Sequence, residues 1–126
     1  MKTNKFTELF MYYGWIVEEL GENSYIAYND TYFVPFSCVS EGKYTNMYAS
    51  AVSYLICDKE AFIEAWRNYN RKNSLRSMAE YPIGFYAFSN WMNRNGYGDK
   101  FTQFGEVANH DHSAFEIECW LKRIHK

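Results

Sequence analysis

The sequence predicts an α+β fold, and three observations support that class. Apolar residues recur every three to four positions in several segments, which is typical of amphipathic helices. Near the N-terminus, aromatic and β-branched residues instead form three short runs separated by turn sequences, which is typical of antiparallel strands. Aromatic residues make up 21% of the 126 positions, in a chain that is 48% hydrophobic and 22% charged. This composition predicts a folded domain with more aromatic surface than a small core usually needs, since one ring can bury roughly 150–250 Å².

The first element is predicted to be a short helix from Asn4 to Tyr13. Its apolar residues fall at i, i+3, i+4 and i+7 and therefore share one face: Phe6, Leu9, Phe10 and Tyr13. Gly14 follows the helix and provides a left-handed stop.

Three strands in an antiparallel meander are predicted next. They are Trp15–Leu20, Ser24–Tyr28 and Thr31–Phe36, with turns at Gly21–Asn23 and Asn29–Asp30. Pro35 cannot donate a ladder hydrogen bond, so we expect the third strand to lie at an edge or to end there. The segment Ser37–Thr45 is rich in Ser, Gly and Lys and is predicted to be a loop.

The central part of the chain is ambiguous at its start. Residues Met47–Cys57 fit a helical stripe or a buried strand, and we favour the helix. Asp58 is predicted to cap a further helix that runs to about Lys72. The buried stripe expected on that helix consists of Phe62, Ile63, Trp66 and Tyr69.

The C-terminal part is predicted to be a set of short helices. One starts near Pro82 and stops at Asn95-Gly96, with a stripe that contains Phe88, Trp91 and Met92. Gly98–Phe104 is expected to be a loop or short helix, Gly105–Asn109 a helical turn, and His112–Lys126 a terminal helix. The core side of the terminal helix is expected to hold Phe115, Cys119 or Ile117, Trp120, Leu121 and Ile124. Residues 1–76 thus form an α+β region and residues 77–126 a helical subdomain, joined in one compact unit.

Within residues 82–126, a series of short motifs resembles the YozE-type helical domain, which is similar to sterile alpha motif domains. The matching motifs are Phe88-x-x-Trp91-Met92, Gly105-Glu106-Val107-Ala108, Asp111 followed by Phe115, and Trp120-Leu121. The resemblance covers about the last third of the chain and implies a compact bundle of short helices that binds another molecule and performs no chemistry. Glu106 stands where the family has Asp, and no Pro follows Phe115.

Composition excludes several classes of protein. The formal net charge of −2 creates no strong electrostatic field. It argues against a protein that coats a polyanion such as a nucleic acid. We expect neither a signal peptide nor a membrane span, because acidic residues interrupt the apolar stretches. The three cysteines are far apart and form no C-x-x-C pair, which is typical of reduced thiols and predicts a cytoplasmic protein. Cys38 lies in the predicted loop and is the thiol we expect to be most exposed.

The sequence contains no strong catalytic or cofactor motif. Asn109–His112 brings two imidazoles and a carboxylate together, and such groups can bind zinc or act as a general base. The alternative is that Asp111 or Ser113 caps the terminal helix and the histidines are solvated. The glycines form no phosphate-binding loop. We therefore predict no cofactor, no metal and no enzymatic activity, with a metal-dependent enzyme at His110–His112 as the least favoured alternative.

The segment Arg67–Arg76 is basic and contains no acidic residue. Its candidate binding residues are Arg67, Tyr69, Arg71, Lys72 and Arg76. Arg67 and Arg71 are four apart and share a helix face, a spacing that suits two phosphates or an acidic protein surface. A solvated helix end is the simplest interpretation, and nucleic-acid binding is the alternative function.

The aromatic residues outside the helical stripes are mainly tyrosines, which combine an apolar ring with a polar tip and are common at interfaces. The candidates are Tyr25, Tyr28, Tyr32, Tyr44 and Tyr48, on the edge of the N-terminal sheet and the loop that follows it. We predict a non-catalytic protein that binds another macromolecule, most readily a protein. By analogy, the small size and the composition suit an accessory protein of a phage or mobile element, such as an inhibitor of a host defence nuclease.

Overall fold

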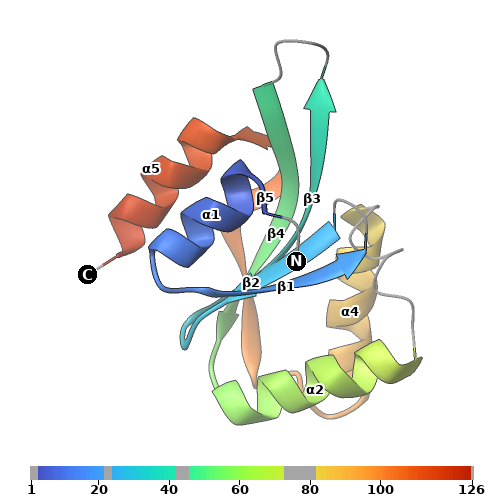
Figure 1. The fold of residues 1–126 in the computed structure, drawn as a ribbon. Helices are drawn as coiled ribbons and strands as arrows, with labels where there is room; N and C mark the ends of the chain where they lie inside the picture. The colour runs from blue at the N-terminus through green and yellow to red at the C-terminus, as the bar shows by residue number, and fades with distance from the viewer. Residues whose placement is uncertain (1–2, 22–23, 42–45, 73–81, 126) are drawn as a thin grey trace.

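The chain folds into a mixed structure of helices and one antiparallel sheet, which confirms the α+β class (Figure 1). The computed structural model describes residues 3–21, 24–41, 46–72 and 82–125, with side chains at 3–19, 25–38, 54–69, 88–102 and 112–125. The elements in chain order are α1 (Lys5–Tyr12), β1 (Ile16–Gly21), β2 (Ser24–Tyr28), β3 (Tyr32–Glu41), β4 (Asn46–Ile56), α2 (Lys59–Lys72), α4 (Pro82–Arg94), β5 (Phe101–Ser113) and α5 (Ala114–Ile124).

The sheet has five strands in the order β1-β2-β3-β4-β5, where the sequence predicted three. The first unexpected strand is β4, which the helical interpretation of Met47–Cys57 missed. β4 lies inside the sheet and pairs with β3 on one side and β5 on the other. This pairing outweighs the helical periodicity, because an inner strand is stabilised by neighbours that are distant in sequence.

Strand β3 also corrects the prediction for Pro35 and for the loop at Ser37–Thr45. β3 continues to Glu41 and lies between β2 and β4, so it is neither an edge strand nor terminated by the proline. Its pairing with β4 passes from Phe33↔Tyr54 to Phe36↔Ala51, and Pro35 lies between these two pairs while it pairs with Ile26 of β2. Strand β3 thus accommodates a proline, which has no backbone N–H to donate, although it is paired with β2 on one side and with β4 on the other.

The second unexpected strand, β5, occupies residues for which loops and helical turns were predicted. Its register against β4 shifts between Ser50↔Asp111 and Val52↔Ala108, and again between Val52↔Ala108 and Ser53↔Phe104. These bulges interrupt the regular alternation of a strand. The bundle of short helices implied for residues 82–126 is therefore not observed, since a long strand separates α4 from α5; the family resemblance itself stays a prediction.

The four helices match their predicted positions, and their ends show why. Asn4 caps α1, since its side chain accepts hydrogen bonds from the amides of Phe6 (2.9 Å) and Thr7 (3.0 Å). Asp58 accepts a bond from the Ala61 amide (3.2 Å) at the start of α2. Two glycines with φ of 85° follow α1 and α4, as the stop signals predicted: Gly14 and Gly96. None of the helices in the described part of the chain has the length and apolar character needed to cross a membrane.

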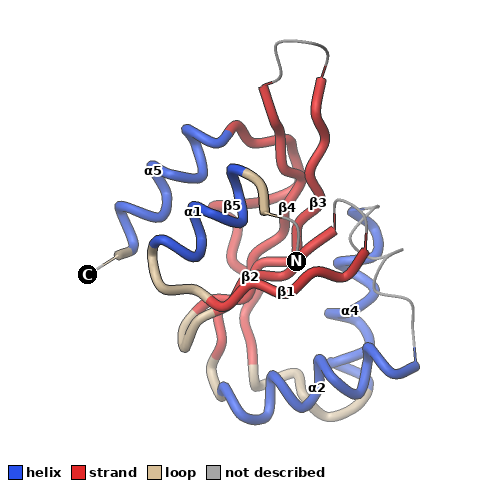
Figure 2. The backbone as a smooth tube through the Cα atoms, viewed as in Figure 1, coloured by secondary structure: helices blue, strands red, loops and turns tan. Residues whose placement is uncertain are grey.

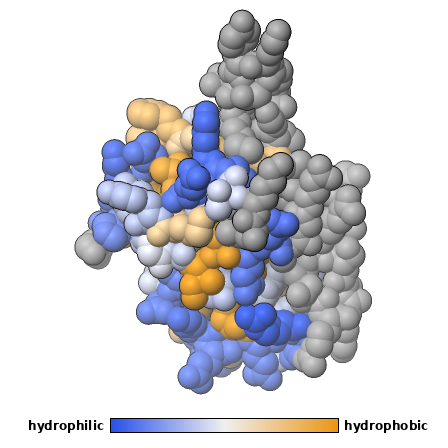
Figure 3. Space-filling view, in the orientation of Figure 1, coloured by the Kyte–Doolittle hydropathy of each residue, from blue (hydrophilic) through white to orange (hydrophobic). Residues whose placement is uncertain are grey.

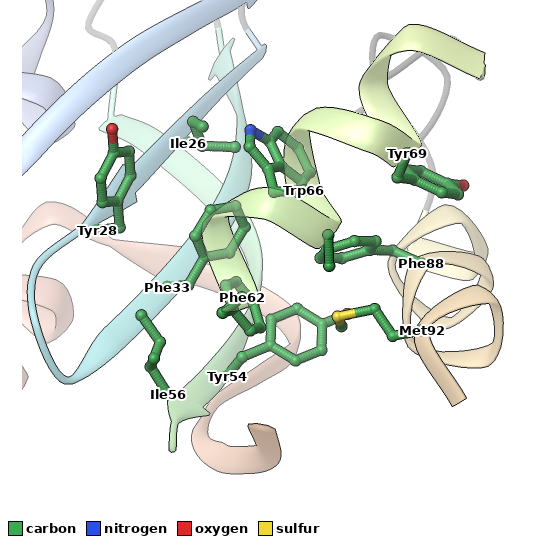
Figure 4. Packing of buried hydrophobic residues seen from close by; sticks show 11 residues of the cluster. Ile26, Tyr28, Phe33, Tyr54, Ile56, Phe62, Trp66, Tyr69, Phe88 and Met92 are labelled. Carbon is green, nitrogen blue, oxygen red and sulfur yellow. The ribbon is translucent and has the colours of Figure 1, made fainter. Parts of the chain in front are cut away.

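Helices cover both faces of the sheet, so the fold has three layers (Figures 1 and 2). Side chains alternate along β2: Tyr25 and Ala27 point to the layer of α1 and α5, whereas Ile26 and Tyr28 point to that of α2 and α4. The buried residues of the α2–α4 core are Ile26, Tyr28, Phe33, Tyr54, Ile56, Phe62, Ala65, Trp66, Tyr69, Phe88 and Met92 (Figure 4). Those of the α1–α5 core are Phe6, Phe10, Trp15, Tyr25, Ala27, Val34, Phe36, Cys38, Ile117, Trp120 and Leu121.

The two cores account for much of the aromatic richness of the chain. An antiparallel sheet commonly leaves one face to solvent and then needs apolar residues only at alternate positions. Here both faces are covered, so successive strand residues are both apolar. Rings also contact rings, as where Phe33 lies 4.9 Å from Phe62 and 4.8 Å from Trp66 between ring centres. Most described aromatic side chains therefore have a packing role that requires no ligand.

Candidate functional site

Three of the tyrosines predicted as binding residues are buried. Tyr25 belongs to the α1–α5 core, and Tyr28 and Tyr69 belong to the α2–α4 core. Burial raises the pKa of all three hydroxyls, most directly at Tyr69, where burial is the sole cause. The ring of Tyr69 also lies 5.0 Å from that of Phe88 and 5.5 Å from that of Trp91, measured between ring centres. The structure therefore places these tyrosines in the interior and not on a binding surface.

The other tyrosine candidates differ in position. Tyr32 is half-buried, with its ring 6.0 Å from that of Trp15 and 5.5 Å from that of Trp120. Tyr44 lies outside the described residues. Tyr48 is in β4, where it pairs with Val39 and Ser113, and its side chain lies outside those described. Tyr32 is thus a packing residue at the border of the α1–α5 core.

The basic segment is placed at the end of α2. Arg67 is exposed and forms an ion pair with Glu18 of β1, at 3.4 Å between Nη2 and Oε1. Arg71 and Lys72 are the last residues of α2, and their side chains lie outside the described set, as does Arg76 entirely. The pairing with Glu18 balances the charge of Arg67, which leaves less positive potential for a phosphate.

The histidine cluster lies at the junction of β5 and α5. His112 is buried, and its Nδ1 lies 3.1 Å from the Glu116 carboxylate. The side chains of His110 and Asp111 lie outside the described residues. Ser113 caps α5, accepting a hydrogen bond from the Glu116 amide (3.2 Å), which confirms one of the two predicted caps. Among the described residues, no group of three His, Cys, Asp or Glu side chains could hold a metal ion.

Cys38 is buried in β3 and is not an exposed loop thiol as predicted. Burial raises its pKa to about 12, an effect opposed by a weak hydrogen bond from the Asn4 side chain (3.9 Å). The thiol is therefore protonated and unreactive at neutral pH. Cys57 and Cys119 are exposed; of the two alternatives predicted for the core side of the terminal helix, Cys119 and Ile117, it is Ile117 that is buried.

The structure instead reveals an open groove between α1 and α5, which run side by side in the same direction (Figure 1). Its volume is about 450 Å³, and we call it the α1–α5 groove. The residues that line it are Lys5, Glu8, Leu9, Tyr12, Tyr13, Ala114 and Glu118. Leu9, Tyr13 and Ala114 are half-buried and pack on the core, so they form an apolar base, while Tyr12 is 82% exposed.

Other large exposed apolar side chains among the described residues lie on α1, on α5 or at the start of β1. Phe115, which follows the lining residue Ala114, is 73% exposed, and Met11 and Ile16 are also exposed. The sequence analysis placed Phe115 in the core, and the structure shows that this was wrong. The space-filling view shows apolar surface over α5 and over the start of β1, among hydrophilic residues (Figure 3).

The angular position of Phe115 around the helix axis, relative to the buried residues of α5, could have placed this side chain on the surface. The buried residues of α5 are spaced i, i+3 and i+4 at Ile117, Trp120 and Leu121, and Ile124 continues the stripe. Phe115 lies two residues before Ile117, about 200° around the helix, so it points away from the stripe. Tyr12 had no such signal, because the groove beside it depends on α5, which is distant in sequence.

No family model matches the chain, and neither the curated proteins nor the solved structures contain a significant match to it.

Proposed function

We propose that this protein is a non-catalytic binding module, and that its contact surface for another protein is the α1–α5 groove with the exposed rings beside it. The observation that supports the proposal is the exposure of Tyr12, which lines an open groove with an apolar base, and of Phe115, which lies on the second helix of that groove. Single exposed apolar residues are common, whereas an apolar cluster around a groove is typical of an interaction site. Aromatic side chains are also enriched at protein interfaces.

Site-specific crosslinking tests this proposal. A photoreactive phenylalanine analogue is introduced at position 12, at position 115, or at the exposed Glu64 of α2 as the matched control. In cells that express the protein, we expect positions 12 and 115 to crosslink to the same protein and position 64 not to do so. Binding of the purified partner should then weaken at least about tenfold in Tyr12→Ser, which is about 1.4 kcal/mol, with an unchanged free energy of unfolding.

Two results would contradict the proposal: crosslinks only at position 64, or unchanged affinity of the Tyr12→Ser variant for the purified partner. The narrower prediction of an inhibitor of a host defence nuclease is tested by the identity of the crosslinked protein.

Nucleic-acid binding by the Arg67–Arg76 segment is the alternative, and the helical position of Arg67 and Arg71 on α2 supports it. The Glu18–Arg67 ion pair argues against it. Binding to DNA or RNA at low salt that is lost in the Arg67→Ala/Arg71→Ala double variant would support this alternative, and no binding at low salt would remove it.

A further inference from the structure

In the described part of the chain, the two edges of the sheet are β1 and β5. An edge strand turns the N–H and C=O groups of alternate residues away from the sheet, where another strand can bond to them. β5 shifts its register against β4 twice, and bulges of this kind make an edge strand a poor partner for further pairing. β1 pairs with β2 without a break from Ile16 to Glu19, so its outer edge is the more regular one.

The apolar side chain at the start of β1 is only partly covered. Trp15 and Val17 pack in the α1–α5 core, so Ile16 points to the opposite face, on which α2 and α4 lie. Tyr28 is opposite Ile16 on β2 and is buried in the α2–α4 core, whereas Ile16 is 51% exposed. The α2–α4 layer therefore covers β2 at this level and leaves the apolar side chain of the outer strand accessible.

The first residues of β1 carry none of the features that protect an edge. Protected edges contain proline, lysine or other charged side chains in the path of an added strand. β1 contains neither proline nor lysine, and it begins with the two apolar residues Ile16 and Val17. The carboxylate of Glu18 is directed towards α2, where its Oε1 lies 3.4 Å from Nη2 of Arg67. The start of β1 thus suits the addition of a further strand.

Like charges argue against a second copy of this chain as that strand. In antiparallel pairing about a two-fold axis, residues on the same face of the sheet oppose each other. A register that overlaps most of β1 is centred on Glu18 or Glu19, which would then lie directly opposite the same residue of the other copy. Like charges in this position destabilise a strand pair. A strand from a different protein has no such conflict.

We propose that the outer edge of β1 binds an extended segment of a partner protein, which adds to the sheet as a further antiparallel strand and covers Ile16 with an apolar side chain. Main-chain hydrogen bonds hold such a segment, and the contact with Ile16 selects an apolar residue opposite it. Ile16 does not line the α1–α5 groove, so this edge is a second surface that can be tested apart from the proposed function.

A capped peptide of alternating Val and Thr, as long as β1, tests the inference on the full chain. In a titration followed by amide NMR shifts, we expect the largest shifts at residues 16–20. Two further peptides carry N-methyl groups, one at the odd and the other at the even positions. An added strand bonds to β1 through alternate residues, so one methylated peptide should bind at least about tenfold more weakly than the parent peptide. The other should bind within about threefold of the parent.

Variants of the protein test the contact with Ile16. Ile16→Ala should weaken binding of the parent peptide about fivefold, because the exposed half of this side chain becomes buried in the complex. Met11→Ala is the matched control, since Met11 is an exposed apolar residue on α1, and it should leave the affinity unchanged. Both variants should unfold in urea in a transition similar to that of the unsubstituted protein, because both side chains are exposed.

Several results would overturn the inference. They are loss of binding in both methylated peptides or in neither, largest shifts at residues outside 16–20, and no binding of the parent peptide. Self-association of the protein that Ile16→Ala abolishes would overturn it in favour of a second copy. The proposed function would stand after any of these results, because the crosslinking experiment at positions 12 and 115 tests the α1–α5 groove on its own.

Discussion

On one face of the sheet, α2 and α4 cover a core composed mostly of rings, whereas on the other face α1 and α5 cover a similar core and also carry exposed rings. The exposed large apolar residues among the described side chains are Met11, Tyr12, Ile16 and Phe115. All lie on α1, on α5 or at the start of β1, and none lies on the described parts of α2 or α4. Among the described side chains, both layers therefore pack a core, and the α1–α5 layer also exposes the large apolar side chains on which the proposed binding surface depends.

The largest expected effect is on the α2–α4 core. Phe33→Ala should lower the free energy of unfolding by about 3–5 kcal/mol, because Phe33 is fully buried and contacts Tyr54, Phe62 and Trp66. Phe10→Ala is the counterpart in the α1–α5 core and should cost about 3 kcal/mol. Urea unfolding followed by fluorescence and circular dichroism gives both values.

The same measurement tests whether the cores are coupled. Both cores use alternate residues of β2 and β3, so each variant should unfold in one transition that both probes report together. Separate transitions would show that the two layers unfold independently.

A second prediction concerns alkaline pH and the α1–α5 core. The pKa of Cys38 is raised from its usual 9.0 to about 12, so the folded state favours the neutral thiol. Its contribution to stability is complete below pH 9 and is lost as the pH rises towards 12, because the unfolded chain ionises first. Between pH 8 and pH 11 the loss should be on the order of 2 kcal/mol.

The control for this prediction is Cys38→Ala, measured by urea unfolding across the same pH range. The variant should lose less stability on going to alkaline pH than the unsubstituted protein does. Parallel pH profiles for the two proteins would contradict the prediction.

A smaller effect concerns the hydrogen bond inside the α2–α4 core. The Ser89 hydroxyl donates to the Tyr54 hydroxyl at 3.2 Å, and both residues are buried. Tyr54→Phe should cost about 1 kcal/mol, because it leaves the Ser89 hydroxyl without this acceptor. A double-mutant cycle with Ser89→Ala should give a coupling of about 0.5–1.5 kcal/mol, and additive losses would exclude a stabilising bond.

The sequence predicted those parts of the fold that depend on local signals. The cap at Asp58 and the stop at Gly96 are set by neighbouring residues, and the helices begin and end where these residues indicated. Strand β4 was missed because its residues Met47, Ala51 and Leu55 fit a helical period as well as a strand, and β5 was missed because its residues were predicted to be loops and helical turns. Pairing between residues such as Leu55 and Thr102, far apart in sequence, decides between the two, and no local pattern reports it.

The candidate site was less predictable for the same reason. Tyr25 and Tyr28 were selected because they lie outside the helical stripes, in the N-terminal sheet, but both are buried because helices cover both faces of the sheet. The groove requires α1 and α5, which are about a hundred residues apart in the chain, to lie side by side. Such a tertiary feature can be recognised in the sequence only where a residue lies at the wrong angle around its helix to join the buried stripe, as Phe115 does.

Phe115 provides the most direct test of the division between packing and exposed rings, because the sequence places it in the core and the structure places it on the surface. The measurement is the free energy of unfolding of Phe115→Ala beside that of Phe88→Ala, whose ring is fully buried. We predict a loss below about 0.5 kcal/mol for Phe115→Ala and at least about 3 kcal/mol for Phe88→Ala. A loss above about 2 kcal/mol for Phe115→Ala would show that this ring packs in the interior and would contradict the binding surface proposed for α1 and α5.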